Sequence, residues 1–127
     1  MFSHLTVGSN DIARSKAFYD SLGQPLGLQC HLESPGGIGY GRQGGRPQLW
    51  IVTPLDKNAA TVGNGITIGL EADTRPAVDA AYAAAMAHGG KDEGTPGLRP
   101  HYHANYYAAY VRDPDGNKVC VVCHKPA

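Results

Sequence analysis

One order of secondary structure is predicted twice along this chain of 127 residues. Residues 4–8 alternate as a strand does, and Asp11 and the two residues before it can cap a helix start. A helix is expected over about 11–22, closed by Gly23 at a positive φ angle. Three strands are expected next, separated by turns rich in glycine and proline, at about 28–33, 37–42 and 48–53. The first half therefore has the order β-α-β-β-β.

The second half returns to this order after a polar linker. A strand is expected at 66–70, followed by a helix with Thr74 as its cap and Gly89 at its end. A loop rich in proline, glycine and histidine is expected over 95–104. Two last strands, at about 105–112 and 117–123, flank a turn in which Asp115-Gly116 is a strong hairpin signal.

These halves predict a single α+β domain over residues 1–127 that contains two βαβββ modules. The first module is expected at about 1–54 and the second at about 65–124, with 55–64 as the linker. The repeat depends on the order of the elements, because few residues are identical between the halves.

Charge and cysteine content restrict the partners that we expect. Eleven basic residues balance eleven acidic ones, so no net field draws the chain to nucleic acid or to an anionic membrane. The apolar stretches are only as long as strands, and the N-terminus lacks the pattern of an export signal. Three cysteines, an odd number, favour reduced thiols. We therefore expect a cytoplasmic protein with a small-molecule partner.

Two stretches of the chain resemble the vicinal-oxygen-chelate superfamily. They are residues 4–19, from His4 through the strand, turn and helix start, and residues 110–117, Tyr-Val-Arg-Asp-Pro-Asp-Gly-Asn. That superfamily contains glyoxalase I, bleomycin and fosfomycin resistance proteins and extradiol dioxygenases. Residues 96–107 resemble a glyoxalase-like bacterial subgroup. The resemblance implies two modules that form a cupped mixed sheet around a divalent metal, in a homodimer with sites between subunits.

The metal ligands implied by the resemblance are mostly missing. His4 stands where the first strand supplies a ligand, but Thr67 replaces a histidine and Cys120 replaces a carboxylate. The strand at 48–53 contains no carboxylate. We expect either no cofactor or one divalent metal, zinc, nickel or iron, held by His4.

Two interpretations of the remaining donors stay open. A zinc site could combine His4 and Cys120 with a histidine from the loop near residue 101. Alternatively, His4 is a hydrogen-bonded wall residue and Cys120 is a small apolar core residue. The Cys-x-x-Cys-His pattern at 120–124 is not interpreted as haem attachment, because residues three apart on a strand point to opposite faces.

The most informative segment for function is residues 99–107, which combine cationic, imidazole and phenolic groups. Aromatic walls with a few polar groups are typical of a small-molecule pocket, although these rings could instead pack a dimer contact. Strand alternation sends Tyr106 and Tyr107 to opposite faces, so only one of them can face a given pocket. Candidate catalytic residues are His101, His103 and Tyr106, and candidate substrate-binding residues are Trp50, Thr67, Arg99, Tyr107 and Cys120.

Three classes of function remain open from the sequence. The leading hypothesis is a glyoxalase-like protein with a small-molecule site in the concave sheet, a lyase or isomerase acting next to a carbonyl if it is catalytic. In that enzyme, His101 or His103 would be a general base and a tyrosine would donate to the developing oxyanion. The alternative is a non-catalytic binding protein of the antibiotic-sequestering type. A purely structural protein would have no enclosed pocket.

Overall fold

The computed structural model describes residues 1–127, and its first half is one mixed sheet with a helix against it. Parallel pairing of β1 with β4 and antiparallel pairing of the others produce the strand order β1-β4-β3-β2. The elements of this module are β1 (Leu5–Gly8), α1 (Ile12–Gly23), the 3₁₀ turn η1 (Gln24–Leu26), β2 (Leu28–Ser34), β3 (Gly37–Arg42) and β4 (Leu49–Val52).

The second half repeats this arrangement, with the strand order β5-β8-β7-β6. Its strand β5 pairs with β8 in parallel, as β1 pairs with β4. The elements are β5 (Ile68–Glu71), α2 (Arg75–Ala87), β6 (Lys91–Leu98), β7 (Tyr107–Arg112) and β8 (Lys118–Cys123). The predicted α+β class and the two βαβββ modules are confirmed.

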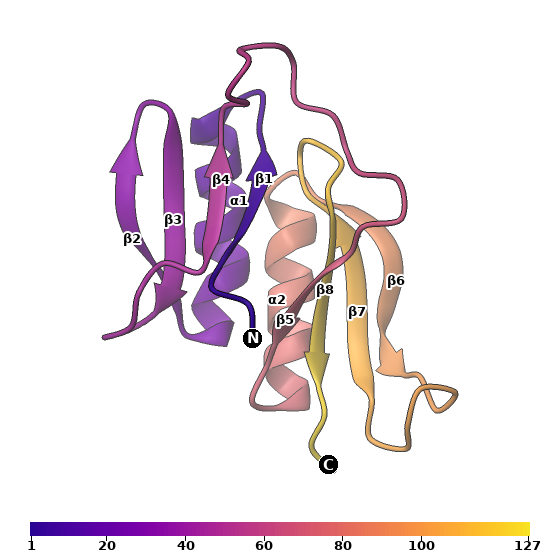
Figure 1. The fold of residues 1–127 in the computed structure, drawn as a ribbon. Coiled ribbons are helices and arrows are strands. Elements are labelled where there is room, and N and C mark those ends of the chain that lie inside the picture. Colours follow the sequence, from indigo (N-terminus) through magenta and orange to yellow (C-terminus); the bar gives the residue numbers. More distant parts are fainter.

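Both helices lie on one side of the two sheets and contact each other (Figure 1). Strands β1, β5 and β8 are near the middle of the molecule, and β2 and β6 are at its two outer edges. The helices and the sheet faces that cover them enclose one core of 18 buried residues, which includes Phe18, Ile51, Val78 and Val121. This core draws on both modules, and no helix covers the sheet faces on the opposite side.

Side-chain caps begin both helices where the sequence predicts them. The Asp11 carboxylate accepts from the Arg14 backbone N–H, and the Thr74 hydroxyl oxygen accepts from the Ala77 N–H. Helix α1 ends at Gly23 as expected, but the expected positive φ is wrong, because Gly23 has φ −75° and the chain continues into η1. The left-handed residue is Gly27, at φ 73°.

Strand β6 was not expected, because it contains Gly94 and its last four residues, Pro96 and Gly97 among them, belong to the predicted loop at 95–104. It is an edge strand that pairs only with β7, and its register shifts on both sides of Gly94. A proline that lacks an N–H donor is tolerated at such an edge, and irregular pairing accommodates the glycines. The loop is thus shorter than predicted and begins at Arg99.

Neither helix combines the length and apolar character needed to span a bilayer.

Candidate functional site

Alternation along β7 and β8 divides their side chains between two environments. Ala109, Val111, Val119 and Val121 belong to the core beneath the helices. Their neighbours on the other face form a second small cluster of Ala108, Cys120 and Val122, with Tyr106 and Tyr110 packed against it. This outer face is therefore apolar at its centre although no helix covers it.

A cavity of about 380 Å³ lies on this outer face, and we call it the β8 cavity. Pairing of β5, β8 and β7 sets its floor, because Gly69 lies beside Cys120 and Cys120 lies beside Tyr110. Its volume is within the range of about 300–1,000 Å³ that is typical of ligand pockets. The lining residues are Thr67, Gly69, Tyr102, Tyr106, Tyr110, Lys118, Cys120, Val122 and His124.

Two tyrosine hydroxyls and one thiol meet in this cavity. The Tyr106 and Tyr110 hydroxyl oxygens are 3.0 Å apart, and the Tyr106 oxygen is 3.7 Å from Cys120 Sγ. Burial, followed by the hydrogen bonds of this group, raises the pKa of Tyr106 above its ordinary value. Burial also raises the pKa of the Cys120 thiol, against the opposing effect of the tyrosine hydrogen bonds. All three groups are therefore neutral and available as hydrogen-bonding partners at neutral pH.

Alkylation of Cys120 by iodoacetamide at neutral pH is expected to be slow, because the residue is 3 % exposed and only the thiolate reacts. The partly exposed Cys30 has a pKa that burial raises too, so exposure is the main difference between the two. We expect roughly tenfold slower modification of Cys120 than of Cys30 by site-resolved mass spectrometry. Equal rates would show that the β8 cavity does not shield the thiol.

The charges around the cavity are positive. Lys118 Nζ lies 5.4 Å from the centre of the Tyr110 ring, and the Arg99 guanidinium carbon lies 5.6 Å from the same centre. Arg99 is also bound to the edge strand, since its guanidinium donates to the carbonyls of Thr95 and Gly97. No carboxylate is among the lining residues, so the cavity favours an anionic or oxygen-rich ligand.

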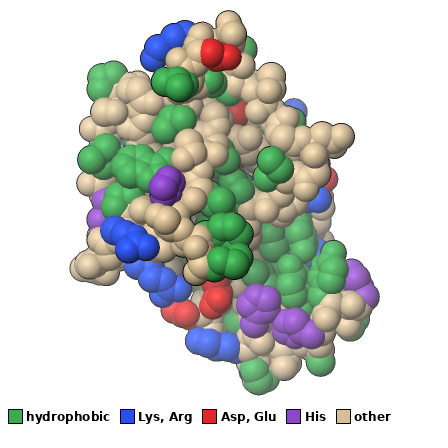
Figure 2. All heavy atoms as spheres, viewed as in Figure 1, with side chains coloured by type: hydrophobic (Ala, Val, Ile, Leu, Met, Phe, Trp, Pro, Cys, Tyr) green, Lys and Arg blue, Asp and Glu red, His purple; other side chains and the backbone are tan.

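His124, Tyr102 and Tyr106 line the cavity at the end where the β6–β7 loop meets the C-terminal segment, and His101 and His103 pack against these rings. Figure 2 shows histidine side chains gathered beside hydrophobic side chains in this part of the surface. His101 packs on Tyr102 at 4.3 Å between ring centroids, with 44° between the ring planes, and Tyr102 packs on Tyr106 at 4.8 Å. His103 Nε2 lies 2.9 Å from Nδ1 of His124.

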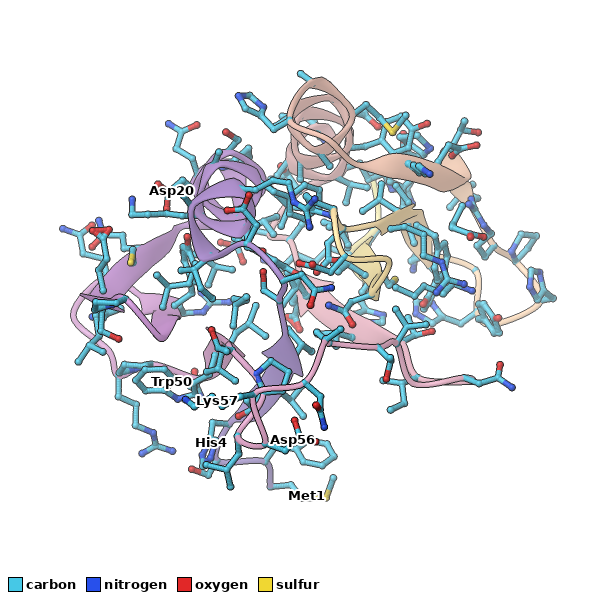
Figure 3. The ribbon with its side chains drawn as sticks, turned by 90° about the horizontal axis from the view of Figure 1, so that it is seen from above. Met1, His4, Asp20, Trp50, Asp56 and Lys57 are labelled. Atoms are coloured by element: carbon cyan, nitrogen blue, oxygen red, sulfur yellow. The ribbon has the colours of Figure 1, made fainter.

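Six of the nine proposed site residues do not line the β8 cavity: His4, Trp50, Arg99, His101, His103 and Tyr107. The Tyr107 hydroxyl donates to Asp79 on α2 at 2.6 Å, so this tyrosine is on the helix side of the sheet, opposite Tyr106. Trp50 lies on β4 over Gly39, on the side of the first sheet away from α1 (Figure 3). Arg99 contacts the cavity only through the Tyr110 ring. Of the predicted residues, the cavity brings together Thr67, Tyr106 and Cys120.

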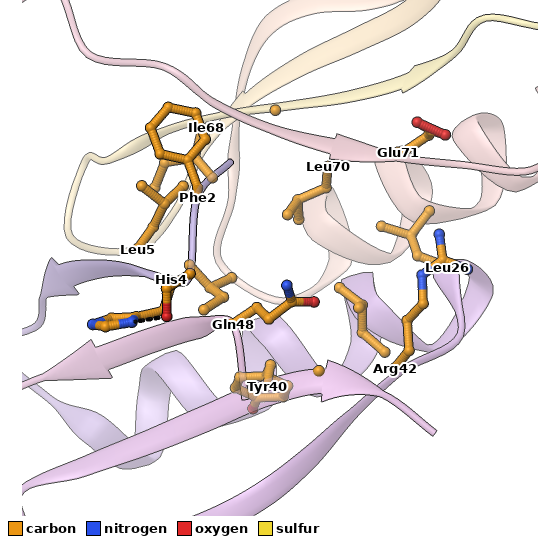
Figure 4. Close-up of a pocket in the computed structure, with 15 residues that line it drawn as sticks. Phe2, His4, Leu5, Leu26, Tyr40, Arg42, Gln48, Ile68, Leu70 and Glu71 are labelled. Atoms are coloured by element: carbon orange, nitrogen blue, oxygen red, sulfur yellow. Dashed lines mark hydrogen bonds between the residues drawn. The ribbon is translucent and has the colours of Figure 1, made fainter. Parts of the chain in front are cut away.

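His4 lines a different cavity, between the lower ends of the two sheets (Figure 4). That cavity measures about 230 Å³, and Gly69 is the residue that it shares with the β8 cavity. The exposed His4 ring has its Nδ1 2.9 Å from the Ser3 hydroxyl. Much of its wall is aliphatic, with side chains such as Leu26, Leu49 and Ile68. It lacks the cluster of phenol, thiol and imidazole groups that lines the β8 cavity.

Comparison with known proteins identifies the family of this chain. The family model of the Glyoxalase/Bleomycin resistance protein/Dioxygenase superfamily matches residues 1–121. The chain belongs to this superfamily. A glyoxalase/bleomycin resistance protein from Albidiferax ferrireducens T118 is 41% identical over 99% of both chains, with a TM-score of 0.87. No match is found among the curated proteins.

Other superfamily structures share the fold at lower identity. A glyoxalase-related enzyme from Fulvimarina pelagi is 21% identical over 97% of this chain and 87% of its own, with a TM-score of 0.74. Lactoylglutathione lyase from Agrobacterium tumefaciens is 23% identical over 97% of this chain and 92% of its own, with a TM-score of 0.65. These likenesses support the architecture.

The residues at the superfamily's metal-ligand positions do not assemble a metal site within one chain. His4 lines one cavity, whereas Thr67 and Cys120 line the other. No three histidine, cysteine or acidic side chains lie close enough together to hold a metal ion. Thr67 is a neutral hydroxyl, and the Cys120 thiol is held protonated by burial. Within a single chain, these positions therefore do not supply a donor set that fits a divalent metal.

Besides the apolar Val122, the cavity contains three polar side chains that the sequence interpretation missed: Tyr110, Lys118 and His124. The register of the predicted hairpin was enough to place Tyr110 and Lys118 on the face of Cys120. Lys118 is two residues from Cys120 on the same strand face, and Tyr110 is the cross-strand partner of Cys120. His124 follows the last residue of β8, and only the packing of the loop near 103 brings it to the cavity.

Proposed function

We propose that this superfamily member binds a small planar organic anion in the β8 cavity without a metal cofactor. The observation that carries the proposal is a cavity lined by Tyr102, Tyr106 and Tyr110 with Lys118 at its side and no carboxylate. Flat aromatic walls bind a planar ligand by stacking, and Lys118 supplies charge complementarity. Thr67 and Cys120 remain proposed ligand contacts, and Lys118 and the three tyrosines are proposed as further contacts.

The proposal is tested by titration calorimetry with 2-naphthoate, a planar anionic probe, in the presence and absence of a chelator. Binding that the chelator does not change supports the proposal. Neutral 2-naphthamide should bind more weakly, because it lacks the charge that pairs with Lys118. Elemental analysis of untagged protein provides the second check, since a stoichiometric metal that is lost in His4→Ala would contradict a metal-free site.

A bulky side chain at Gly69 should block the cavity. A Cβ at this position meets no atom within 4 Å, and its φ is ordinary, so Gly69→Trp adds volume to the open space without backbone strain. We expect 2-naphthoate binding to be lost, with the free energy of unfolding changed by less than about 0.5 kcal/mol. The matched control is Gly36→Trp, another unstrained open position that does not line the cavity. Unchanged binding in Gly69→Trp would place the probe elsewhere.

An enzyme that acts next to a carbonyl is the second candidate function. It is favoured by the imidazole of His124 beside the Tyr106 ring, at 5.4 Å between centroids, since a base and a phenolic donor are what enolisation needs. His101 and His103, the bases proposed from the sequence, pack against Tyr102 and His124 and do not line the cavity themselves. The test is turnover of the hemithioacetal of methylglyoxal and glutathione. Product formation that is lost in Tyr106→Phe would favour catalysis over binding alone.

A homodimer is part of the proposal. Apolar side chains are exposed at Phe2, Leu5, Val62 and Ile66, and the β2 and β6 edges are unpaired within the chain. A site that joined His4 to Thr67 and Cys120 would need a second copy, because one chain separates them. Sedimentation equilibrium should give twice the chain mass. The three free thiols agree with the cytoplasmic location that we propose.

A further inference from the structure

Two histidines from distant parts of the sequence form a hydrogen-bonded pair at the edge of the β8 cavity. His103 belongs to the β6–β7 loop, and His124 follows β8 directly. Their rings are stacked, with 5.2 Å between centroids and 23° between planes. The Tyr106 ring stands edge-on to both, at 5.5 Å from His103 and 5.4 Å from His124. This packing holds the two imidazoles in one relative orientation.

The backbone determines which nitrogen of each ring carries the proton. The Asn105 N–H donates to Nδ1 of His103 at 3.1 Å, so that nitrogen is an acceptor and the proton of the neutral ring is on Nε2. His103 Nε2–H then donates to Nδ1 of His124 at 2.9 Å. The proton of the neutral His124 ring is therefore on its own Nε2. The hydrogen bonds are therefore donated in one direction, from Asn105 to His103 and from His103 to His124.

This order of donors argues against the pair as a metal site. A nitrogen that coordinates a metal must present a lone pair, and His103 Nε2 carries a proton as long as Nδ1 accepts from Asn105. His124 lines the cavity, whereas His103 lies behind it. The remaining ring nitrogen of His124 is thus a fixed hydrogen-bond donor at the cavity edge.

We propose that His103 is a positioning residue that holds His124 in the Nε2–H form, so that His124 donates to an oxygen of the bound ligand. This inference rests on the proposed function and narrows its ligand to an anion or carbonyl compound whose oxygen reaches His124. Lys118 attracts the ligand by its charge, and the His124 N–H orients the ligand oxygen through a directional hydrogen bond. A ligand whose only polar group is a donor would leave His124 unpaired and is rejected.

The tautomer of His124 is measured by nitrogen-15 NMR of the imidazoles in the full-length protein. In the wild type, His124 is expected in the Nε2–H form. In His103→Phe, which keeps a ring but no donor, the two tautomers of His124 should be mixed. His103→Gln, whose side-chain amide can donate to His124, should restore the Nε2–H form. His88→Phe is the control, because His88 lies after α2 and bonds the Ala84 carbonyl.

Affinity for 2-naphthoate is the second readout on the same proteins. We expect about fivefold weaker binding in His103→Phe and recovery in His103→Gln. An Nδ1–H form of His124 in the wild type, or a tautomer unchanged in His103→Phe, would overturn the proposed role of His103 whatever the affinities are. A wild-type protein that shows the expected tautomers but does not bind 2-naphthoate would overturn the donor role and, separately, the proposed function.

Discussion

Asp113→Ala is expected to lower the free energy of unfolding by about 3–5 kcal/mol, measured by urea denaturation. The Asp113 side chain, in a residue 3 % exposed, accepts four hydrogen bonds. Its Oδ2 accepts from the Tyr19 hydroxyl at 2.7 Å and from the Asn117 amide at 3.0 Å. Its Oδ1 accepts from the backbone N–H groups of Asp115 and Asn117, each at 2.9 Å. Alanine would leave these donors without a partner in the interior.

The effect should extend beyond the turn, because this turn joins the modules. The adjacent Asp115 Oδ1 accepts from the Asn10 N–H and from Arg14, each at 2.8 Å, so the start of α1 is bound to the β7–β8 turn. The Asn117 amide also donates to the Gly8 carbonyl at the end of β1. Loss of Asp113 therefore weakens a contact between the first module and the second.

Two controls separate this network from ordinary surface hydrogen bonds. Asp79→Ala removes the acceptor of the Tyr107 hydroxyl at an exposed site and should cost less than about 1 kcal/mol. Tyr19→Phe removes one buried donor and leaves the other three bonds of Asp113, so an intermediate loss of about 1–2 kcal/mol is expected. If Asp113→Ala were no more destabilising than Asp79→Ala, the turn would not be a determinant of stability.

Lys118→Glu is expected to weaken 2-naphthoate binding by about 30-fold. Lys118 is the one formal cation among the residues that line the β8 cavity, and it lies over the Tyr110 ring. Reversal of its charge replaces an attraction with a repulsion of similar size. The loss should shrink as salt is added, because part of the site is open to solvent.

The change in charge must be distinguished from a change in the protein as a whole. Lys57→Glu makes the same alteration in the exposed linker and should change affinity by less than about twofold. Neutral 2-naphthamide should bind Lys118→Glu and the wild type about equally, since it senses only the aromatic walls. Equal loss for both compounds would mean that Lys118→Glu disrupts the cavity and would remove the support for an anionic ligand.

Much of the architecture follows from local patterns in the sequence. The capping side chains of Asp11 and Thr74 and the Asp115-Gly116 turn act on residues close to them in the chain, so their spacing predicts both helices and the last hairpin. The repeated element order and the motifs at 4–19 and 110–117 were enough to identify the superfamily. Alternation also separated Tyr106 from Tyr107 correctly.

The contents of the site depended on interactions between distant residues. Strand β6 forms because β7 offers it a partner, although Gly94 and Pro96 favour a loop locally. His103 meets His124 only after β6, β7 and β8 have paired, and no periodicity links residues from a loop and a tail. His4 is separated from Thr67 and Cys120 by the way the two modules pack.

The sequence by itself determined the elements and the family, because hydrogen bonds and caps within an element act over a few residues. The tertiary structure alone decided which side chains share a cavity, because strand register and module packing set distances between residues far apart in the chain.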